Sequence, residues 1–171
     1  PWRARERGAR SAVRAANEYC VLHDASYLRP LLLHGEAAAL TELLAGLTDA
    51  SADALGRLLG APRELCCTLH WWRRWPSATI APVRLLPCAA AANGGRRAVW
   101  VFVHEAAALQ ARSALEHAIG LALAARAADA AGAPPALVLG ASTLPVVRFQ
   151  LRGPQSHGLL RRALALAPAA A

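Results

Sequence analysis

The chain carries the same short pattern twice: a strand-like segment, then a glycine, then a helix with leucines at helical spacing. The first copy contains Leu33-His34-Gly35-Glu36, and the second contains Leu151-Arg152-Gly153-Pro154. Glycine allows a sharp turn from strand to helix, because no Cβ atom restricts its backbone. Such a repeat predicts split βαβ units, in which helices cover one face of a mixed sheet. We therefore expect an α/β fold, in the wide sense that includes α+β folds.

Hydrophobic spacing predicts where the elements lie. Apolar runs favour strands, and leucines three and four residues apart favour helices. Strands are expected near residues 28–33, 65–72, 79–86, 98–103 and 146–151, and helices near residues 1–18, 37–47, 105–127 and beyond Gly153. The expected division of the chain is a basic helical segment (1–18), a first α/β unit (19–127), an Ala-, Pro- and Gly-rich linker (128–145) and the start of a second strand–helix unit (146–171).

The charge of the chain indicates its class of partner. The sequence has 19 basic residues, every one an arginine, against 11 acidic residues, which gives a net charge of +8. Such an excess makes nucleic acid the leading class of partner and an anionic membrane the next. No apolar run is long enough to cross a bilayer. Of these two classes we expect nucleic acid and no membrane partner.

Two further features of the composition bear on where the chain works. The chain contains no methionine and begins with Pro1, so we expect it to be an internal piece of a longer protein. Its four cysteines include no Cys-x-x-Cys pair. This favours free thiols in a reducing compartment over a disulfide framework.

Two groups of arginines are candidate RNA contacts. The first group recurs at steps of three and four residues, so its members would share one face of a helix: Arg3, Arg7, Arg10 and Arg14. A solvated helix face explains the same spacing. The second group is Arg73 and Arg74, which stand among tryptophans in a segment where Pro76 predicts a turn. Guanidinium groups bind phosphates and aromatic rings stack on unpaired bases, although these tryptophans also suit packing against the core.

Catalytic and metal-binding patterns are incomplete. His23 and Asp24 are neighbours, with Ser26 close by, but adjacent residues of a strand point to opposite sides and cannot form a triad. His104-Glu105 begins like a zinc-protease helix, yet Ala108 stands where the second histidine is required. We expect no catalytic residue, no metal and no cofactor.

One stretch resembles a known family. Residues 10–16 are rich in Arg and Ala and lead into His23-Asp24-Ala25-Ser26-Tyr27, followed by a strand that ends near Gly35. This is similar to the signature of the large protein subunit of eukaryotic RNase P and RNase MRP. Weaker matches follow in the family's order at residues 75–83, 99–104 and 149–160. Together the matches cover about residues 10–160.

The resemblance implies a fold similar to the glycine-cleavage T-protein. It also implies a non-catalytic scaffold that binds the RNase P or MRP RNA and smaller protein subunits, in the nucleus and nucleolus. The RNA would perform the 5′ cleavage of precursor tRNA and the processing of precursor rRNA. His23 and Tyr27 would then join the arginines as RNA contacts, while Asp24, Ser26, Gly35 and Gly153 would hold the local structure. No small-molecule substrate is expected. The alternative function is a folate-dependent aminomethyltransferase, an enzyme that has this implied fold.

Overall fold

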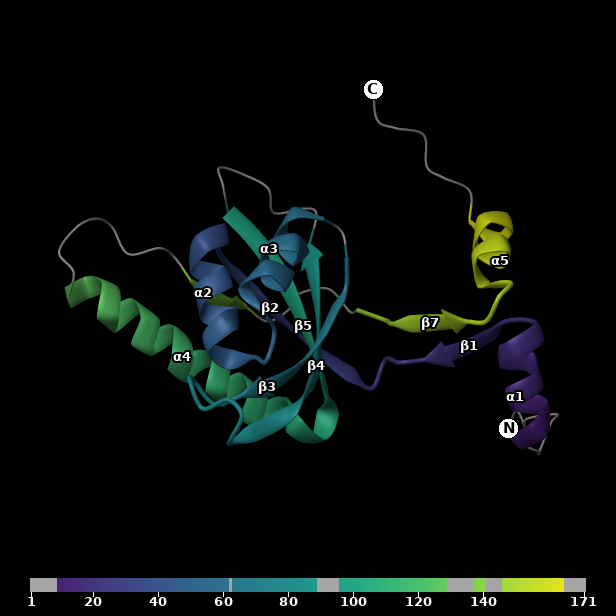
Figure 1. Cartoon of the computed structure of the whole chain (residues 1–171), viewed down its shortest axis with the longest axis horizontal. Coiled ribbons are helices and arrows are strands. Elements are labelled where there is room, and N and C mark those ends of the chain that lie inside the picture. Colours follow the sequence, from purple (N-terminus) through teal and green to yellow (C-terminus); the bar gives the residue numbers. More distant parts are fainter. Residues whose placement is uncertain (1–8, 62, 89–95, 129–136, 141–145, 165–171) are drawn as a thin grey trace, which may run out of the picture. The chain divides into compact units, whose positions relative to one another are not determined.

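A computed structural model describes residues 9–61, 63–88, 96–128, 137–140 and 146–164. The chain forms two compact units (Figure 1). The central unit runs from Tyr27 to Val146, and the terminal unit combines Pro1–Ser26 with Val147–Ala171. The sequence led us to expect consecutive segments, whereas the structure joins the two ends of the chain in one unit.

The central unit contains a five-stranded sheet with the strand order β3-β4-β5-β2-β6. Every pairing between these strands is antiparallel. The expected α/β class is confirmed, and the described sheet is antiparallel where a mixed sheet was expected. The strands are β2 (Leu28–Glu36), β3 (Leu65–His70), β4 (Thr79–Cys88), β5 (Arg96–His104) and β6 (Val138–Gly140).

Three helices cover one face of this sheet, as expected. They are α2 (Ala37–Leu47), α3 (Ala52–Gly60) and α4 (Ala108–Ala128), and the last follows a 3-10 turn at Glu105–Ala107. Helix α3 was not predicted, because only Leu55 and Leu58 of its nine residues are buried. One core holds side chains from all three helices and from alternate strand positions, among them Leu40, Leu44, Leu55, Leu115, Leu33, Val83, Val99 and Val101.

The alternation of β5 decides which of its residues reach that core. Val99, Val101 and Val103 belong to it, so Trp100 and Phe102 project from the opposite face of the sheet. Phe102 is buried and Trp100 is half-buried, and their ring centroids lie 6.2 Å apart.

The terminal unit consists of α1 (Ala9–Glu18), β1 (Val21–Asp24), β7 (Phe149–Arg152) and α5 (Ser156–Ala163). β1 pairs antiparallel with β7, and α1 and α5 stand at the same end of this ribbon (Figure 1). Neither helix has a buried residue within these bounds. No helix among the described residues of either unit is long and apolar enough to span a membrane.

Candidate nucleic-acid interface

Arg73 and Arg74 lie in the turn between β3 and β4, and several hydrogen bonds within the turn fix its backbone. The Trp71 N–H donates to the Ala78 carbonyl at 3.2 Å, and the Arg74 N–H donates to the Trp71 carbonyl at 2.9 Å. The Ser77 hydroxyl donates back to the Arg74 carbonyl at 2.7 Å. This loop contains a cis Trp75–Pro76 peptide bond, and Arg73 has a φ of 53°. The predicted turn is confirmed. We call residues 71–78 the basic turn.

The tryptophans of the basic turn have different surroundings. Trp72 packs against the hydrophobic core, and Trp71 makes an edge contact with His117 of α4 at a centroid distance of 6.4 Å. Trp75, in contrast, is 61% exposed. Packing against the core and beneath a helix therefore explains Trp71 and Trp72, while Trp75 presents a ring to solvent.

Arg73 is held over this aromatic base. Its guanidinium carbon lies 5.2 Å from the Trp72 ring centroid, which is a cation–π distance. Its backbone N–H donates to the Gly46 carbonyl of α2 at 2.6 Å. Arg74 is exposed and forms no ion pair with a described residue. The basic turn therefore carries two exposed guanidinium groups and one exposed indole on a hydrogen-bonded loop.

A buried histidine anchors the start of this turn. His70 is 3% exposed, and its Nδ1 lies 3.1 Å from the Ser77 carbonyl and 3.3 Å from the Thr79 hydroxyl. Its Nε2 has no hydrogen-bond partner among the described residues. The carbonyl contact requires a proton on Nδ1, so the imidazole closes the loop by a hydrogen bond across the strand ends. The sequence alone did not predict this role for His70.

In the His-Asp-Ala-Ser-Tyr box, the first two residues belong to a strand and a turn follows them. His23 and Asp24 lie in strand β1, opposite Gln150 and Phe149. The turn begins one residue later, where the Ser26 N–H donates to the Asp24 carboxylate at 2.9 Å. Hydrogen bonds from the Ser26 side chain and backbone hold the pKa of Asp24 below its usual value. The Ser26 hydroxyl also accepts the Arg148 N–H at 3.2 Å, so Asp24 and Ser26 order the end of this ribbon.

Tyr27 belongs to the central unit. It is 49% exposed, and its ring lies 5.5 Å from that of His104 at the end of β5. Close to it, the Arg29 guanidinium forms an ion pair with Glu105, in which Arg29 Nη2 lies 2.9 Å from Glu105 Oε1. That ion pair lowers the pKa of the Glu105 carboxyl. The exposed Tyr27 ring is separate in sequence from the basic turn and is a second accessible aromatic group.

The two glycines expected to turn a strand into a helix behave differently. Gly153 has a φ of +126°, and a Cβ atom there would come within 2.5 Å of the Tyr19 carbonyl oxygen. Gly35 lies inside β2, opposite Arg97, and the strand continues to Glu36 before α2 begins. The turning role expected of Gly35 is therefore wrong, because the chain enters the helix from extended backbone at Glu36.

The N-terminal arginines are only partly described. Arg10 and Arg14 lie on α1 and are exposed, and Arg14 pairs with Glu18 at 2.9 Å. Arg3 and Arg7 lie outside the described residues. By sequence, the terminal unit has nine arginines against three acidic residues, and the central unit has ten against eight. Most of the net charge therefore belongs to the terminal unit, although its residues come from both ends of the chain.

The described residues contain no cluster of histidine, cysteine and acidic side chains that could hold a metal ion. Burial raises the pKa of the Cys67 thiol to about 12, so this group stays protonated and does not act as a nucleophile or ligand near neutral pH. The described site provides positively charged guanidinium groups and aromatic rings for stacking.

Comparison with known proteins defines the class of fold. No family model matches this chain, and no curated protein sequence matches it. Among solved structures it resembles the crystal structure of the glycine cleavage system aminomethyltransferase T from Bartonella henselae, with a TM-score of 0.57 and 17% identity. The match covers 92% of this chain and 35% of that one, so this chain spans about a third of its length. The likeness confirms the expected T-protein-like fold.

Proposed function

We propose that this chain is a non-catalytic RNA-binding scaffold, and that its RNA is that of RNase P or RNase MRP. The observation that carries the proposal is the basic turn, where Arg73 and Arg74 stand beside the exposed ring of Trp75. Phosphates bind guanidinium groups, and unpaired bases stack on aromatic rings. A rigid loop with both features suits a single-stranded segment or bulge of a folded RNA.

The distribution of charge supports the same function. The terminal unit has a net excess of six arginines over acidic residues, against two for the central unit. Concentrated positive charge attracts RNA through release of its counterions. Arg10 and Arg14 of α1 and Arg161 and Arg162 of α5 lie on exposed surfaces of that unit.

Exposed apolar side chains support a scaffold role toward protein subunits. The described part of the terminal unit exposes several large apolar residues, each by more than two fifths, including Val13, Leu22, Phe149, Leu159 and Leu160. Contiguous exposed apolar surface marks sites where another protein binds. A subunit that binds both RNA and smaller proteins needs both kinds of surface. The nucleus and nucleolus are the expected locations for such a complex, in which the RNA is the catalyst.

The test is RNA binding as a function of salt, measured by fluorescence anisotropy with labelled RNase P RNA and MRP RNA. The double variant Arg73→Gln/Arg74→Gln should weaken binding and reduce the slope of log K against log salt by about 0.7–0.9 per lost phosphate contact. The matched control is Arg57→Gln/Arg112→Gln, which removes the same charge from two exposed helix ion pairs. Equal losses in both variants would mean that only net charge matters and that the basic turn is not an interface.

A second candidate function is a folate-dependent aminomethyltransferase activity. The likeness to the T protein favours it, although this likeness concerns the fold, and a fold hosts many functions. Calorimetric titration with a reduced folate separates the two proposals. Stoichiometric binding together with an absence of RNA binding would favour the enzyme, whereas salt-dependent RNA binding without folate binding would favour the scaffold.

A further inference from the structure

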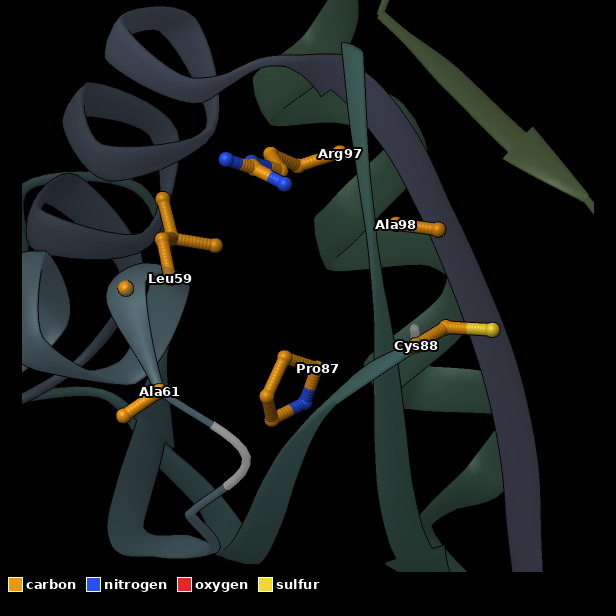
Figure 2. A pocket seen from close by; sticks show the side chains of 7 residues that line it. Leu59, Ala61, Pro87, Cys88, Arg97 and Ala98 are labelled. Atoms are coloured by element: carbon orange, nitrogen blue, oxygen red, sulfur yellow. The ribbon is translucent and has the colours of Figure 1, made fainter. Parts of the chain in front are cut away.

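A pocket of about 250 Å³ opens at one edge of the sheet of the central unit, between the C-terminal end of α3, the end of β4 and the start of β5. Leu59 and Ala61 line it on the helix side, and Pro87 and Arg97 line it on the strand side (Figure 2). The side chains of Leu59 and Arg97 point toward each other across this space, while the sulfur of Cys88 points away from it. None of these residues belongs to the basic turn.

The walls of the pocket are apolar and it contains one charge. Leu59, Ala61 and Pro87 offer only hydrocarbon, whereas Arg97 brings a guanidinium group. No hydrogen bond or ion pair joins that guanidinium to another described residue. A cation beside apolar walls suits a ligand that carries one anionic group on an apolar body, because such pockets fix a ligand through a few polar groups.

The helix and strands around the pocket favour one orientation of such a ligand. The C-terminal end of α3, at Gly60, carries the partial negative charge of the helix dipole. An anionic group is therefore repelled from the helix side and attracted to the strand side, where Arg97 lies. The apolar body of the ligand would then rest against Leu59 and Pro87.

The size of the pocket limits that body. Pockets for drug-sized ligands have volumes of about 300–1,000 Å³, and this one lies just below that range at about 250 Å³. A single ring with a short anionic group fits this volume, whereas a ligand of several linked rings does not.

We propose that this pocket binds a carboxylate or phosphate ester on a single apolar ring, with the anionic group on Arg97. The site is separate from the proposed RNA interface and does not depend on it. Such a ligand is a free small molecule, because a nucleotide joins its polar base to a ribose ring and so has several linked rings.

The experiment is a titration of the 171-residue chain with phenyl phosphate, followed by amide chemical shifts. Benzyl alcohol, which has the ring without the charge, is the neutral control. Arg97→Gln should lower the affinity for phenyl phosphate at least tenfold. Its matched control is Arg96→Gln, which removes an exposed charge from the neighbouring residue, outside the pocket lining, and should change affinity less than twofold.

The outcomes are distinct. Shifts near Leu59 and Ala61 that disappear in Arg97→Gln alone would support the site. Equal weakening in the two variants, or binding of benzyl alcohol as tight as that of phenyl phosphate, would overturn it. Failure of uridine 5′-monophosphate to displace phenyl phosphate would support the single-ring limit, and equally tight binding of this nucleotide would overturn it. The result for the basic-turn variants is independent of either outcome.

Discussion

The ring of Trp72 lies directly against Gly46 near the C-terminal end of α2, so closely that a Cβ atom on Gly46 would come within 2.3 Å of Trp72 Cζ3. The Gly46 carbonyl at the same place accepts the Arg73 N–H at 2.6 Å. Alanine has a higher helix propensity than glycine, but the Trp72 ring occupies the space that an alanine Cβ atom would need at this position.

Gly46→Ala should destabilise the protein by about 1–3 kcal/mol, since the indole must move from a packed position. It should also weaken RNA binding, because Arg73 rests on the displaced ring. Chemical denaturation and anisotropy measure the two effects. Gly56→Ala is the control, because a Cβ atom there meets nothing within 4 Å. That variant should gain up to about 1 kcal/mol from helix propensity. An increase in stability in both variants would contradict the packing described for Trp72.

Gly153→Ala should loosen the terminal unit. Alanine at a φ of +126° strains the backbone, and its Cβ would collide with the Tyr19 carbonyl. This strain should lower the free energy of local opening by about 1–3 kcal/mol, and amide exchange in β1 and β7 should become faster by the corresponding factor. In Gly158→Ala, where a Cβ meets nothing within 4 Å, exchange should be unchanged or slower. Unchanged exchange in Gly153→Ala would show that this turn is not required.

The two adjacent cysteines should react at very different rates. Cys66 is exposed and receives a contact from Arg84 Nη1 at 3.5 Å, whereas burial raises the pKa of Cys67 to about 12. At pH 8 the Cys67 thiol is therefore almost entirely protonated. Iodoacetamide followed by peptide mass spectrometry should find Cys66 alkylated first and Cys67 protected until unfolding. In Cys66→Ser, Cys67 should remain unreactive; rapid labelling there would contradict its burial.

Acid should destabilise the central unit partly through Asp49. Its carboxylate accepts the Thr68 N–H at 2.8 Å, and this hydrogen bond lowers the pKa of Asp49 below 3.8. A lowered folded-state pKa contributes stability above the unfolded value, and that contribution is lost as pH falls through the folded value. Thermal melts should therefore show a lower melting temperature below about pH 4. Asp49→Asn should cost about 1 kcal/mol at pH 7. The difference between variant and parent should shrink as the pH falls below 4, and a constant difference would exclude this linkage.

Much of the central unit could be predicted from sequence, because its elements are decided by local spacing. The leucines of α2 recur at helical steps, and the valines of β5 alternate, so both elements follow from which residues must be buried. Three short elements were not predicted. α3 buries only two residues, β1 has no buried residue, and β6 has three residues, so each has too few positions for a period to show.

The site was predictable only in part. The run of tryptophan and arginine residues before Pro76 indicated a surface turn, and that signal is local. The support of the turn by Gly46 and His70 is not local, since Gly46 lies 26 residues before Trp72. An isolated glycine within a helical pattern was the one available hint, because such a glycine lowers helix stability and often has a packing reason.

The sequence by itself determined the α/β class, the basic character and the place of the basic turn, because periodicity, composition and proline act over a few residues. The tertiary structure alone decided three other features. It brought the two charged ends of the chain into one unit, exposed Trp75 while packing Trp71 and Trp72, and set Arg97 across a pocket from Leu59. These features depend on contacts between residues far apart in the chain, and such contacts follow from burial of the whole core, not from any local pattern.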